Sequence, residues 1–358
     1  ALMHPTYWPE VRRGSERYIH DLASGLTAAG HAPELLTSHP GPHRRGTVDG
    51  LSVVYHRRQP DGWLRRRRFD DFWSHVPLAY RSLSRGDYEL AHAFYPTDAL
   101  AAAHWSRRTG RPSLFSVMGI PNPLIKIRFD SQPRAARACT DVTVDSRAVA
   151  SAFFYRWGIE TKVVYPGVDL KAFTPGPGRA ADPVVFCPAP VNVPRKRVGW
   201  LVEALPRLLR ARPGLRLLLM RPDEPAAASQ LEAVEGVELF DAVQTPEELA
   251  PLYRRAWVTA LPSWGEAFGM VLIESLACGT PVVAARRDAA PEIVDGDGVG
   301  RLFDDEDHAE SLAAALLEAL DLAAQPDTSE ACRARAGVFS VDRTVAAFES
   351  LYEELLSG

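Results

Sequence analysis

Short apolar runs alternate along the chain with longer segments in which apolar residues recur every three or four positions. In the first half of the chain six such runs are bounded by polar or turn-forming residues, at 34–38, 51–56, 90–94, 113–118, 142–146 and 162–166. Segments of helical period, such as 15–29 and 147–157, lie between several of them. Strands that alternate with amphipathic helices are typical of a parallel sheet with helices on both faces.

A segment rich in proline and glycine, residues 165–183, interrupts this pattern and has the composition of a linker. Strand and helix patterns then resume, and a last helical segment, 341–356, follows the final strand. The pattern predicts the α/β class, with two Rossmann-like domains whose parallel sheets face a deep cleft between them. The expected parts are a first domain, a linker, a second domain and a C-terminal helix that crosses back, at 1–165, 166–183, 184–340 and 341–358.

Composition narrows the class of protein. With 46% hydrophobic and 24% charged residues, the 358-residue chain has the balance of a soluble globular protein, and its net charge of −4 gives no reason to expect a nucleic-acid partner. No apolar run reaches the roughly 18 residues of a membrane span, and no signal peptide is visible. The four widely spaced cysteines favour a reducing compartment over a zinc site or disulfides. We therefore expect a cytoplasmic protein.

The segment GEAFGMVLIESLACGTP, residues 265–281, predicts a loop, a helix and a Gly-Thr-Pro stop. Glu274 lies in the middle of this helix, whose other residues are almost all apolar. Because a buried, unpaired carboxylate costs on the order of several kcal/mol, Glu274 needs a partner in the protein or in a ligand. The preceding amides, of Ala267, Phe268 and Gly269, lie at the helix N-terminus and suit a phosphate or a sugar hydroxyl.

Two interpretations of the paired acids remain open from the residues alone. In the first, Glu266 accepts hydrogen bonds from ligand hydroxyl groups, and Glu274, two turns further on, holds a cis-diol such as a ribose. In the second, Glu274 pairs with an arginine in the core and Glu266 is a solvated loop residue.

The pair Glu266 and Glu274, with Pro262-Ser263 before it and Gly-Thr-Pro-Val-Val after it, resembles the E-x7-E signature of retaining GT-B glycosyltransferases of glycosyltransferase family 4. The likeness extends over nearly the whole chain. Four further segments resemble, in the same order, the glycine loop with the first helix, the strand–histidine segment, the interdomain segment and the basic phosphate-binding loop of this family, at 13–31, 90–102, 165–173 and 194–205.

The resemblance implies that the second domain binds a nucleotide-diphosphate sugar and that the first binds the acceptor. Glu266 would contact the transferred sugar, assisted by the amides of residues 267–269, and Glu274 would hold the ribose. Lys196, with Arg195 or Arg197, would neutralise the diphosphate, because clustered cations suit a leaving group with two negative charges. Taken alone, the sequence Pro-Arg-Lys-Arg is equally typical of a solvated helix start.

In the first domain the resemblance implies roles for a glycine and a histidine. The backbone of Gly14, ahead of a helix that Ser15 would cap, can approach the diphosphate or the acceptor closely because it carries no side chain. His92 would contact the donor sugar or the acceptor, alongside Glu266 and Lys196, although a lone histidine is as typical of a structural position. Ser146 matches a cleft-lining serine, or caps a helix.

Three departures from the family pattern are visible. Pro190 and Val191 stand where the family commonly has Gly-Arg, Arg13 precedes Gly14 where a Gly-Gly pair is usual, and Met118 replaces a sugar-contacting histidine. These changes keep two alternatives open, a sugar-nucleotide epimerase of the same fold and a non-catalytic nucleotide-sugar binding protein. An NAD enzyme is disfavoured because no G-x-G-x-x-G follows a strand.

The family's chemistry implies transfer to an acceptor hydroxyl with retention of anomeric configuration, and no bound metal or cofactor. The triplets Asp295-Gly-Asp297 and Asp305-Glu-Asp307 are interpreted as surface loops rather than a metal site. The acceptor stays open among a natural product, a glycolipid and a saccharide. The basic segment Arg65–Arg68, which lies among aromatic residues, is interpreted as an exposed helix, an acceptor loop or a peripheral contact with the inner face of a membrane.

Overall fold

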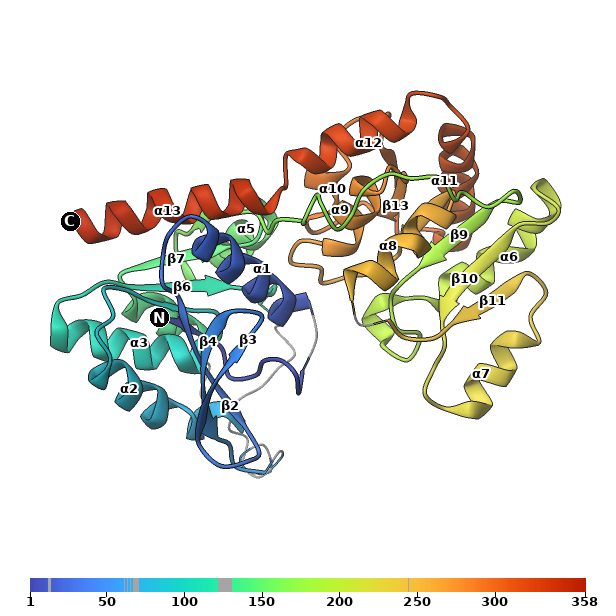
Figure 1. The fold of residues 1–358 in the computed structure, drawn as a ribbon. Coiled ribbons are helices and arrows are strands. Elements are labelled where there is room, and N and C mark those ends of the chain that lie inside the picture. Colours follow the sequence, from blue (N-terminus) through green and yellow to red (C-terminus); the bar gives the residue numbers. More distant parts are fainter. Residues whose placement is uncertain are drawn as a thin grey trace. The chain divides into compact units, whose positions relative to one another are not determined.

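The chain forms two compact units, each built around its own parallel sheet. The computed structural model describes residues 1–11, 14–60, 62, 64, 66, 71–121, 131–243 and 245–358. Domain 1 comprises Ala1–Pro166 together with Val341–Gly358, and domain 2 comprises Gly167–Ser340. The predicted α/β class is confirmed, and in each unit helices cover the sheet (Figure 1). The cleft expected between the two domains stays a prediction.

Domain 1 contains a sheet of eight strands in the order β3-β4-β2-β1-β5-β6-β7-β8. Neighbouring strands are parallel except β3 and β4, which are antiparallel. The strands are β1 Leu2–Met3, β2 Glu34–His39, β3 Arg44–Val48, β4 Leu51–Arg57, β5 Ala91–Ala93, β6 Ser113–Val117, β7 Asp141–Val144 and β8 Lys162–Val163. The apolar runs predicted the six strands from β2 to β8 other than β3. Edge strand β3 escaped prediction because its residues are polar and largely exposed.

The helices of domain 1 are α1 Gly14–Ala28, α2 Val76–Arg85, α3 Pro96–Thr109, α4 Ser131–Ala138, α5 Arg147–Trp157 and α13 Val341–Ser357, with a 3₁₀ turn at Asp71–Ser74. Three of them, α1, α5 and α13, begin within a residue of where the pattern placed them, and the pattern did not place the others. Ser146 caps α5, because its hydroxyl accepts the Val149 N–H at 3.2 Å. Ser15 lies inside α1 and donates to Glu16 instead, so its predicted capping role is wrong.

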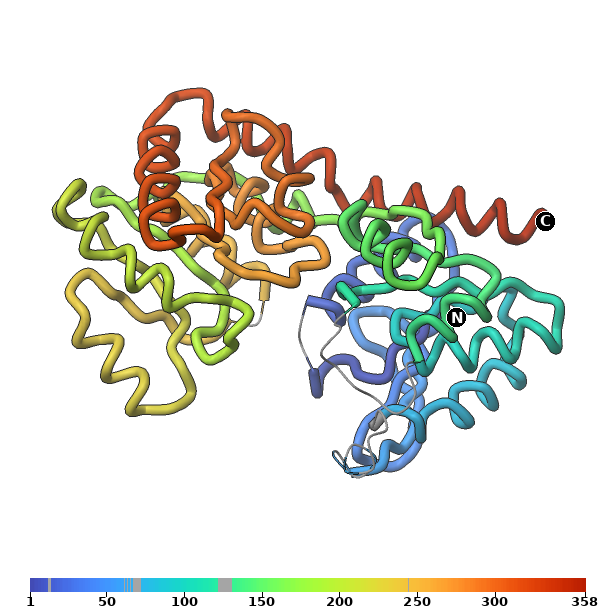
Figure 2. The backbone as a smooth tube through the Cα atoms, turned by 180° about the vertical axis from the view of Figure 1, so that it is seen from behind, coloured from blue at the N-terminus to red at the C-terminus, as the bar shows by residue number. Residues whose placement is uncertain are grey.

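The last helix, α13, belongs to domain 1 although it follows domain 2 in the chain. Figures 1 and 2 both show it against α1, with which it is in contact. Val345, Phe348 and Leu351 are buried in the same hydrophobic cluster as Leu22 of α1. A side chain at Gly25 would meet Val345 Cγ2 at 2.4 Å, so the two helices approach closely at this glycine. Helix α13 therefore contributes buried residues to the core of domain 1.

Domain 2 contains six parallel strands in the order β11-β10-β9-β12-β13-β14. The strands are β9 Val184–Cys187, β10 Arg216–Met220, β11 Val237–Phe240, β12 Val258–Leu261, β13 Val282–Ala285 and β14 Gly300–Phe303. The helices are α6 Gly199–Ala211, α7 Pro225–Glu232, α8 Pro246–Arg255, α9 Met270–Ala277, α10 Ala290–Ile293, α11 His308–Ala323 and α12 Thr328–Gly337, with a 3₁₀ turn at Pro194–Lys196. The central strands β9, β12 and β13 are buried along their whole length, as continuous apolar runs in a parallel sheet require.

The stretch interpreted as a linker, 166–183, lies mostly within domain 2. It forms no helix or strand beyond a single bridge between Val168 and Ser340. Arg333 of α12 donates to the carbonyl oxygens of Leu170 and Phe173, and the Phe173 side chain is buried. The composition of this stretch reflects irregular backbone, with a turn at 170–172, that is held by packing and hydrogen bonds rather than a free connection.

Candidate functional site

The predicted donor-binding residues of domain 2 lie at one edge of its sheet. The carboxyl ends of parallel strands share an edge, and ligands of such sheets bind where the strand order reverses. In domain 2 the order reverses at β9, since β10 lies on one side of it and β12 on the other. Lys196 follows β9 and Glu266 follows β12, so the two residues flank this point.

Lys196 and Arg195 converge on the carboxylate of Glu266. Lys196 Nζ lies 2.5 Å from Glu266 Oε1, and Arg195 Nη1 lies 3.1 Å from the same oxygen. The Lys196 and Glu266 side chains are 14% and 17% exposed, so their ion pair is only partly screened by solvent. The Trp264 N–H also donates to the Arg195 carbonyl at 2.9 Å. The structure therefore brings together the cations and the acid that the sequence analysis assigned to the diphosphate and the sugar.

A second pair of cations is held by Asp305, which follows β14. Its Oδ1 lies 2.8 Å from Arg197 Nη1, and its Oδ2 lies 2.5 Å from Arg287 Nη1. Burial disfavours the ionised carboxylate, but the two guanidinium groups outweigh it and hold the pKa of Asp305 below its ordinary value. Arg197 also lies over the Trp200 ring, 4.1 Å from its centroid. Asp305 lies in a surface loop, as interpreted, and its side chain is 34% exposed; in addition it bridges two arginines, one of which directly follows Lys196.

Glu274 lies inside domain 2 and has a protein partner. The residue is 1% exposed, and its Oε2 accepts a hydrogen bond of 2.7 Å from the hydroxyl of Tyr253 in α8. This donor is a phenol, which neither interpretation of the sequence foresaw. The role of Glu274 in holding a ribose stays a prediction.

Residues 267–269 lead directly into α9, as predicted. Helix α9 begins at Met270, and Gly269 precedes it with φ 108°, a conformation that glycine adopts at little cost. The Phe268 side chain is buried and lies edge-on to Phe339, 5.3 Å between ring centroids. The phenylalanine thus anchors the loop in the core while its backbone runs to the helix N-terminus.

The structure contradicts the predicted contact between His92 and a substrate. His92 has no exposed surface, and its Nδ1 and Nε2 lie 2.6 Å from Tyr352 Oη and Ser116 Oγ, respectively. Burial drives the pKa of His92 well below its ordinary value, so the ring is neutral. Its position inside β5, between β1 and β6, explains the error, because a strand end at the sheet edge and a strand interior look alike in sequence.

The other predicted positions of domain 1 are placed as follows. Gly14 begins α1, and a Cβ there would meet nothing within 4 Å, so its predicted close approach to a ligand stays a prediction. Met118 packs against the hydrophobic core of domain 1. Arg13, and Arg65, Arg67 and Arg68 of the basic segment, lie outside the described residues.

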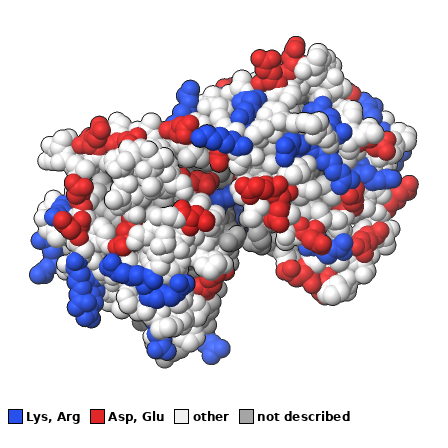
Figure 3. All heavy atoms as spheres, viewed as in Figure 1, with Lys and Arg blue, Asp and Glu red and all other residues white. Residues whose placement is uncertain are grey.

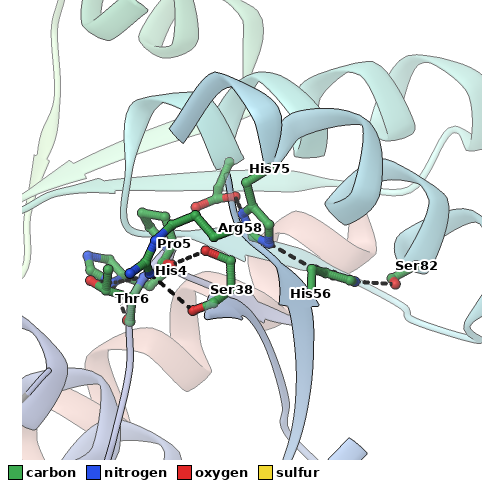
Figure 4. A network of polar contacts seen from close by, with 9 residues as sticks. His4, Pro5, Thr6, Ser38, His56, Arg58, His75 and Ser82 are labelled. Atoms are coloured by element: carbon green, nitrogen blue, oxygen red, sulfur yellow. Dashed lines mark hydrogen bonds and ion pairs between the residues drawn. The ribbon is translucent and has the colours of Figure 1, made fainter. Parts of the chain in front are cut away.

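A buried polar network occupies the carboxyl edge of the domain 1 sheet (Figure 4). His75 connects Asp98 to His56, with Nδ1 2.7 Å from Asp98 Oδ1 and Nε2 2.9 Å from His56 Nδ1. His56 Nε2 in turn lies 2.7 Å from Ser82 Oγ. Desolvation, together with the neighbouring histidines His75 and His43, lowers the pKa of His56 to about 3. A neutral His56 is a weak base, which favours a structural role for this network.

Three residues beside the donor site were not singled out from the sequence: Tyr253, Arg287 and Asp288. Asp288 follows β13 and accepts hydrogen bonds from the Gly265 and Glu266 amides. One sequence signal pointed to it, since an acid three residues after the end of a buried parallel strand lies near the ligand-binding edge of the sheet. No local pattern marks Tyr253, whose apolar ring suits a core position.

The distribution of surface charge and of possible metal ligands points to no additional site among the described residues. On the face shown in Figure 3, acidic and basic side chains are interspersed over each domain. Within the described ranges, no three His, Cys, Asp or Glu side chains are grouped so as to hold a metal ion. None of the helices formed by the described residues has the length and apolar character that crossing a membrane requires.

Comparison with solved structures defines the class of fold. Sucrose-phosphate synthase from Thermosynechococcus elongatus is 22% identical with a TM-score of 0.81, covering 99% of this chain and 98% of that one. HepE from Anabaena, solved in complex with UDP-glucose, is 20% identical with a TM-score of 0.71, covering 99% and 98%. With two Rossmann-like domains, the chain has the GT-B fold.

Sequence comparison then points to the family. The family model "Glycosyltransferase Family 4" matches residues 12–172, and "Glycosyl transferases group 1" matches residues 182–321. A D-inositol 3-phosphate glycosyltransferase from Saccharomonospora viridis is 34% identical over 221 residues, which are 55% of this chain and 51% of that protein. Together the two models match most of the chain, and they bear out the resemblance to glycosyltransferase family 4 seen in its motifs. The chain spans about half the length of the curated relatives it matches.

Proposed function

We propose that this protein transfers a sugar from a nucleotide-diphosphate donor to an acceptor hydroxyl with retention of anomeric configuration. The observation that carries the proposal is the convergence of Lys196, Arg195 and Glu266 at the strand-order reversal of domain 2. Clustered cations and a carboxylate at such a point suit a diphosphate joined to a polyhydroxylated sugar. The family-model matches and the UDP-glucose complex of HepE support the same donor class.

The chemistry required of these residues is electrostatic. In the proposed transfer the bond between the sugar's anomeric carbon and the diphosphate oxygen breaks, and the acceptor oxygen bonds to that carbon from the same face. The acceptor proton passes to the departing diphosphate. Lys196 and Arg195 stabilise the charge that develops on the diphosphate, and Glu266 binds hydroxyl groups of the sugar. The acceptor is a hydroxyl compound bound by domain 1.

The test is a panel of UDP-, GDP- and dTDP-sugars with candidate acceptors, including a cyclitol phosphate because of the name of the curated relative. We expect release of nucleoside diphosphate that depends on the acceptor, and a product whose anomeric configuration, read by NMR, equals that of the donor. Lys196→Ala should abolish release, whereas Lys171→Ala, at an exposed lysine of the 166–183 stretch, should retain it.

Three outcomes would contradict the proposal. Isomerisation of the sugar nucleotide without an acceptor would identify an epimerase. Binding without turnover across the panel would identify a nucleotide-sugar binding protein. A product of inverted anomeric configuration would show that the protein transfers the sugar but that the proposed retention is wrong.

A further inference from the structure

Asp288 lies beside Glu266 and has no part in the chemistry above. It follows β13, and its backbone φ of 52° lies in the left-handed region. Residues with side chains seldom adopt that conformation, although aspartate does so more readily than most. Its side chain is 19% exposed. A conformation of this kind persists where contacts of the residue stabilise it.

The closest of these contacts lead to the loop that carries Glu266. Asp288 Oδ2 accepts the Gly265 N–H at 2.6 Å and the Glu266 N–H at 3.4 Å. Hydrogen bonds from amides to a carboxylate are roughly twice as strong as those between neutral groups. The carboxylate therefore fixes the orientation of the two peptide groups immediately before the Glu266 side chain.

The same loop is held from its other side by the turn that carries Lys196. The Trp264 N–H donates to the Arg195 carbonyl oxygen at 2.9 Å. Gly265, which follows Trp264 and donates to Asp288, has φ 71°, a conformation that glycine adopts at little cost. With its backbone fixed at two points, Glu266 places its carboxylate on Lys196 Nζ at 2.5 Å.

An ion pair with Arg287 explains the position of Asp288 less well than the hydrogen bonds to the two amides do. Arg287 Nε lies 3.5 Å from Asp288 Oδ2, whereas Arg287 Nη1 lies 2.5 Å from Asp305 Oδ2. The carboxylate closest to Arg287 is therefore that of Asp305, whereas the closest partner of the Asp288 carboxylate is the Gly265 amide.

We propose that Asp288 is a positioning residue, which sets the Glu266 carboxylate for the transferred sugar by binding the amides of Gly265 and Glu266. This inference rests on the proposed function.

Two substitutions separate the hydrogen bonds from the charge. Asp288→Asn keeps an oxygen that accepts the amide protons and removes the charge. Asp288→Gly removes the acceptor, and glycine tolerates the φ of 52° without strain. The matched control is Asp304→Asn, since Asp304 lies in the same domain and pairs, at 3.1 Å, with the exposed Arg286.

The readouts are steady-state kinetics with the sugar nucleotide that wild-type protein turns over, and amide hydrogen exchange of peptides covering 262–270. We expect Asp288→Gly to lower kcat about 10- to 100-fold with KM changed less than about threefold, as a displaced catalytic group does. Exchange at Gly265 and Glu266 should rise in this variant. Asp288→Asn and Asp304→Asn should keep wild-type exchange and most of the activity.

Wild-type kcat and exchange in Asp288→Gly would overturn the proposal. Equal loss of kcat in both Asp288 variants with unchanged exchange would also overturn it, because charge rather than loop position would then matter. If wild-type protein binds and turns over no sugar nucleotide, the proposed function fails. The exchange comparison then decides by itself whether Asp288 holds the loop, and unchanged exchange in the Gly variant would refute that too.

Discussion

At the scale of single residues, the proposed donor site sets the carboxylate of Glu266 in competition with the diphosphate for the same cations. Lys196 and Arg195 both contact its Oε1, at 2.5 and 3.1 Å. A diphosphate that binds these cations displaces the carboxylate, which then faces the hydroxyl groups of the attached sugar. The proposed function therefore couples donor binding to the placement of Glu266 through one pair of cations.

The coupling predicts that Glu266→Gln strengthens nucleotide binding while it removes activity. Loss of the competing charge should lower the Kd for the nucleoside diphosphate about three- to tenfold, equivalent to about 1 kcal/mol for a partly exposed ion pair. Titration calorimetry at low and high salt measures the effect, which should shrink as salt screens the cations. Asp304→Asn is the control for loss of a nearby carboxylate. Weaker binding in Glu266→Gln would show that Glu266 does not compete.

For the corresponding substitution at Glu274 we expect the opposite change in nucleotide affinity. Glu274→Gln keeps the shape of the side chain and an acceptor for the Tyr253 hydroxyl, so the free energy of unfolding should change little. If the carboxylate holds a ribose, the Kd for nucleotide should rise about tenfold or more, the cost of losing hydrogen bonds to a charged group. Tyr253→Phe, which removes the hydroxyl that donates to Glu274, should lower the free energy of unfolding by about 1 kcal/mol. Unchanged nucleotide affinity in Glu274→Gln would make this acid a structural residue.

At the scale of elements, the polar network of domain 1 joins β4, α2 and α3 through side chains alone. His56 lies on β4, Ser82 on α2 and Asp98 in the first turn of α3, and His75 directly precedes α2. His56 and His75 are 3% and 1% exposed. Such a network stabilises the packing of the elements only while its groups keep their protonation states.

Domain 1 should accordingly lose stability on acidification below about pH 6.5. The pKa of His56 is about 3 when folded and 6.5 ordinarily, so between these values the unfolded chain binds a proton that the folded chain does not. The contribution of His56 to the free energy of unfolding is therefore fully present above pH 6.5. Below pH 6.5 it decreases by up to about 1.4 kcal/mol for each unit by which the pH is lowered. The lowered pKa values of His4 and His92 act in the same direction. Asp145, whose pKa burial raises to about 8, opposes them between about pH 4 and 8.

Hydrogen exchange of β4 and α2 peptides at pH 5 and pH 7, corrected for intrinsic rates, measures this slope. His56→Gln should reduce the difference in protection between the two pH values. The control is His104→Gln, at an exposed position on α3, which should leave the slope as in wild-type protein. A slope unaffected by His56→Gln would assign the acid sensitivity to other groups.

At the scale of the whole molecule, the chain has two independent cores, and its C-terminal helix belongs to the first. Phe348 of α13 is fully buried in domain 1, whereas Leu356 of the same helix is 51% exposed. Phe348→Ala should destabilise domain 1 by about 3–5 kcal/mol through the cavity it leaves. Domain 2 should keep its stability, because no residue of its sheet lies in that core.

Hydrogen exchange resolved by domain tests this expectation. In Phe348→Ala, protection should fall in β2 and β4 and stay unchanged in β9 and β12. Leu356→Ala, the matched control, should leave both domains as in wild-type protein. Equal loss in both domains would show that the two cores unfold together.

Local sequence determined the segments that became elements. Apolar runs placed β2, β4 and β6 to within a residue or two, because a strand buried in a parallel sheet must be apolar over its whole length. The spacing of Glu266 and Glu274 and the adjacent glycines likewise placed the loop and helix α9. Edge strand β3 was missed, since its polar and largely exposed residues form no apolar run and it is defined by its pairing with β4.

Only the tertiary structure decided which side chains meet. Arg197 and Asp305 form an ion pair across 108 residues, because the strand order places the ends of β9 and β14 at one edge. Contacts between separate elements likewise gave Glu274 a tyrosine partner in domain 2 and, in domain 1, enclosed His92 between Tyr352 and Ser116. Burial and electrostatic pairing depend on distance in space, which the order of strands sets and the spacing of residues along the chain does not.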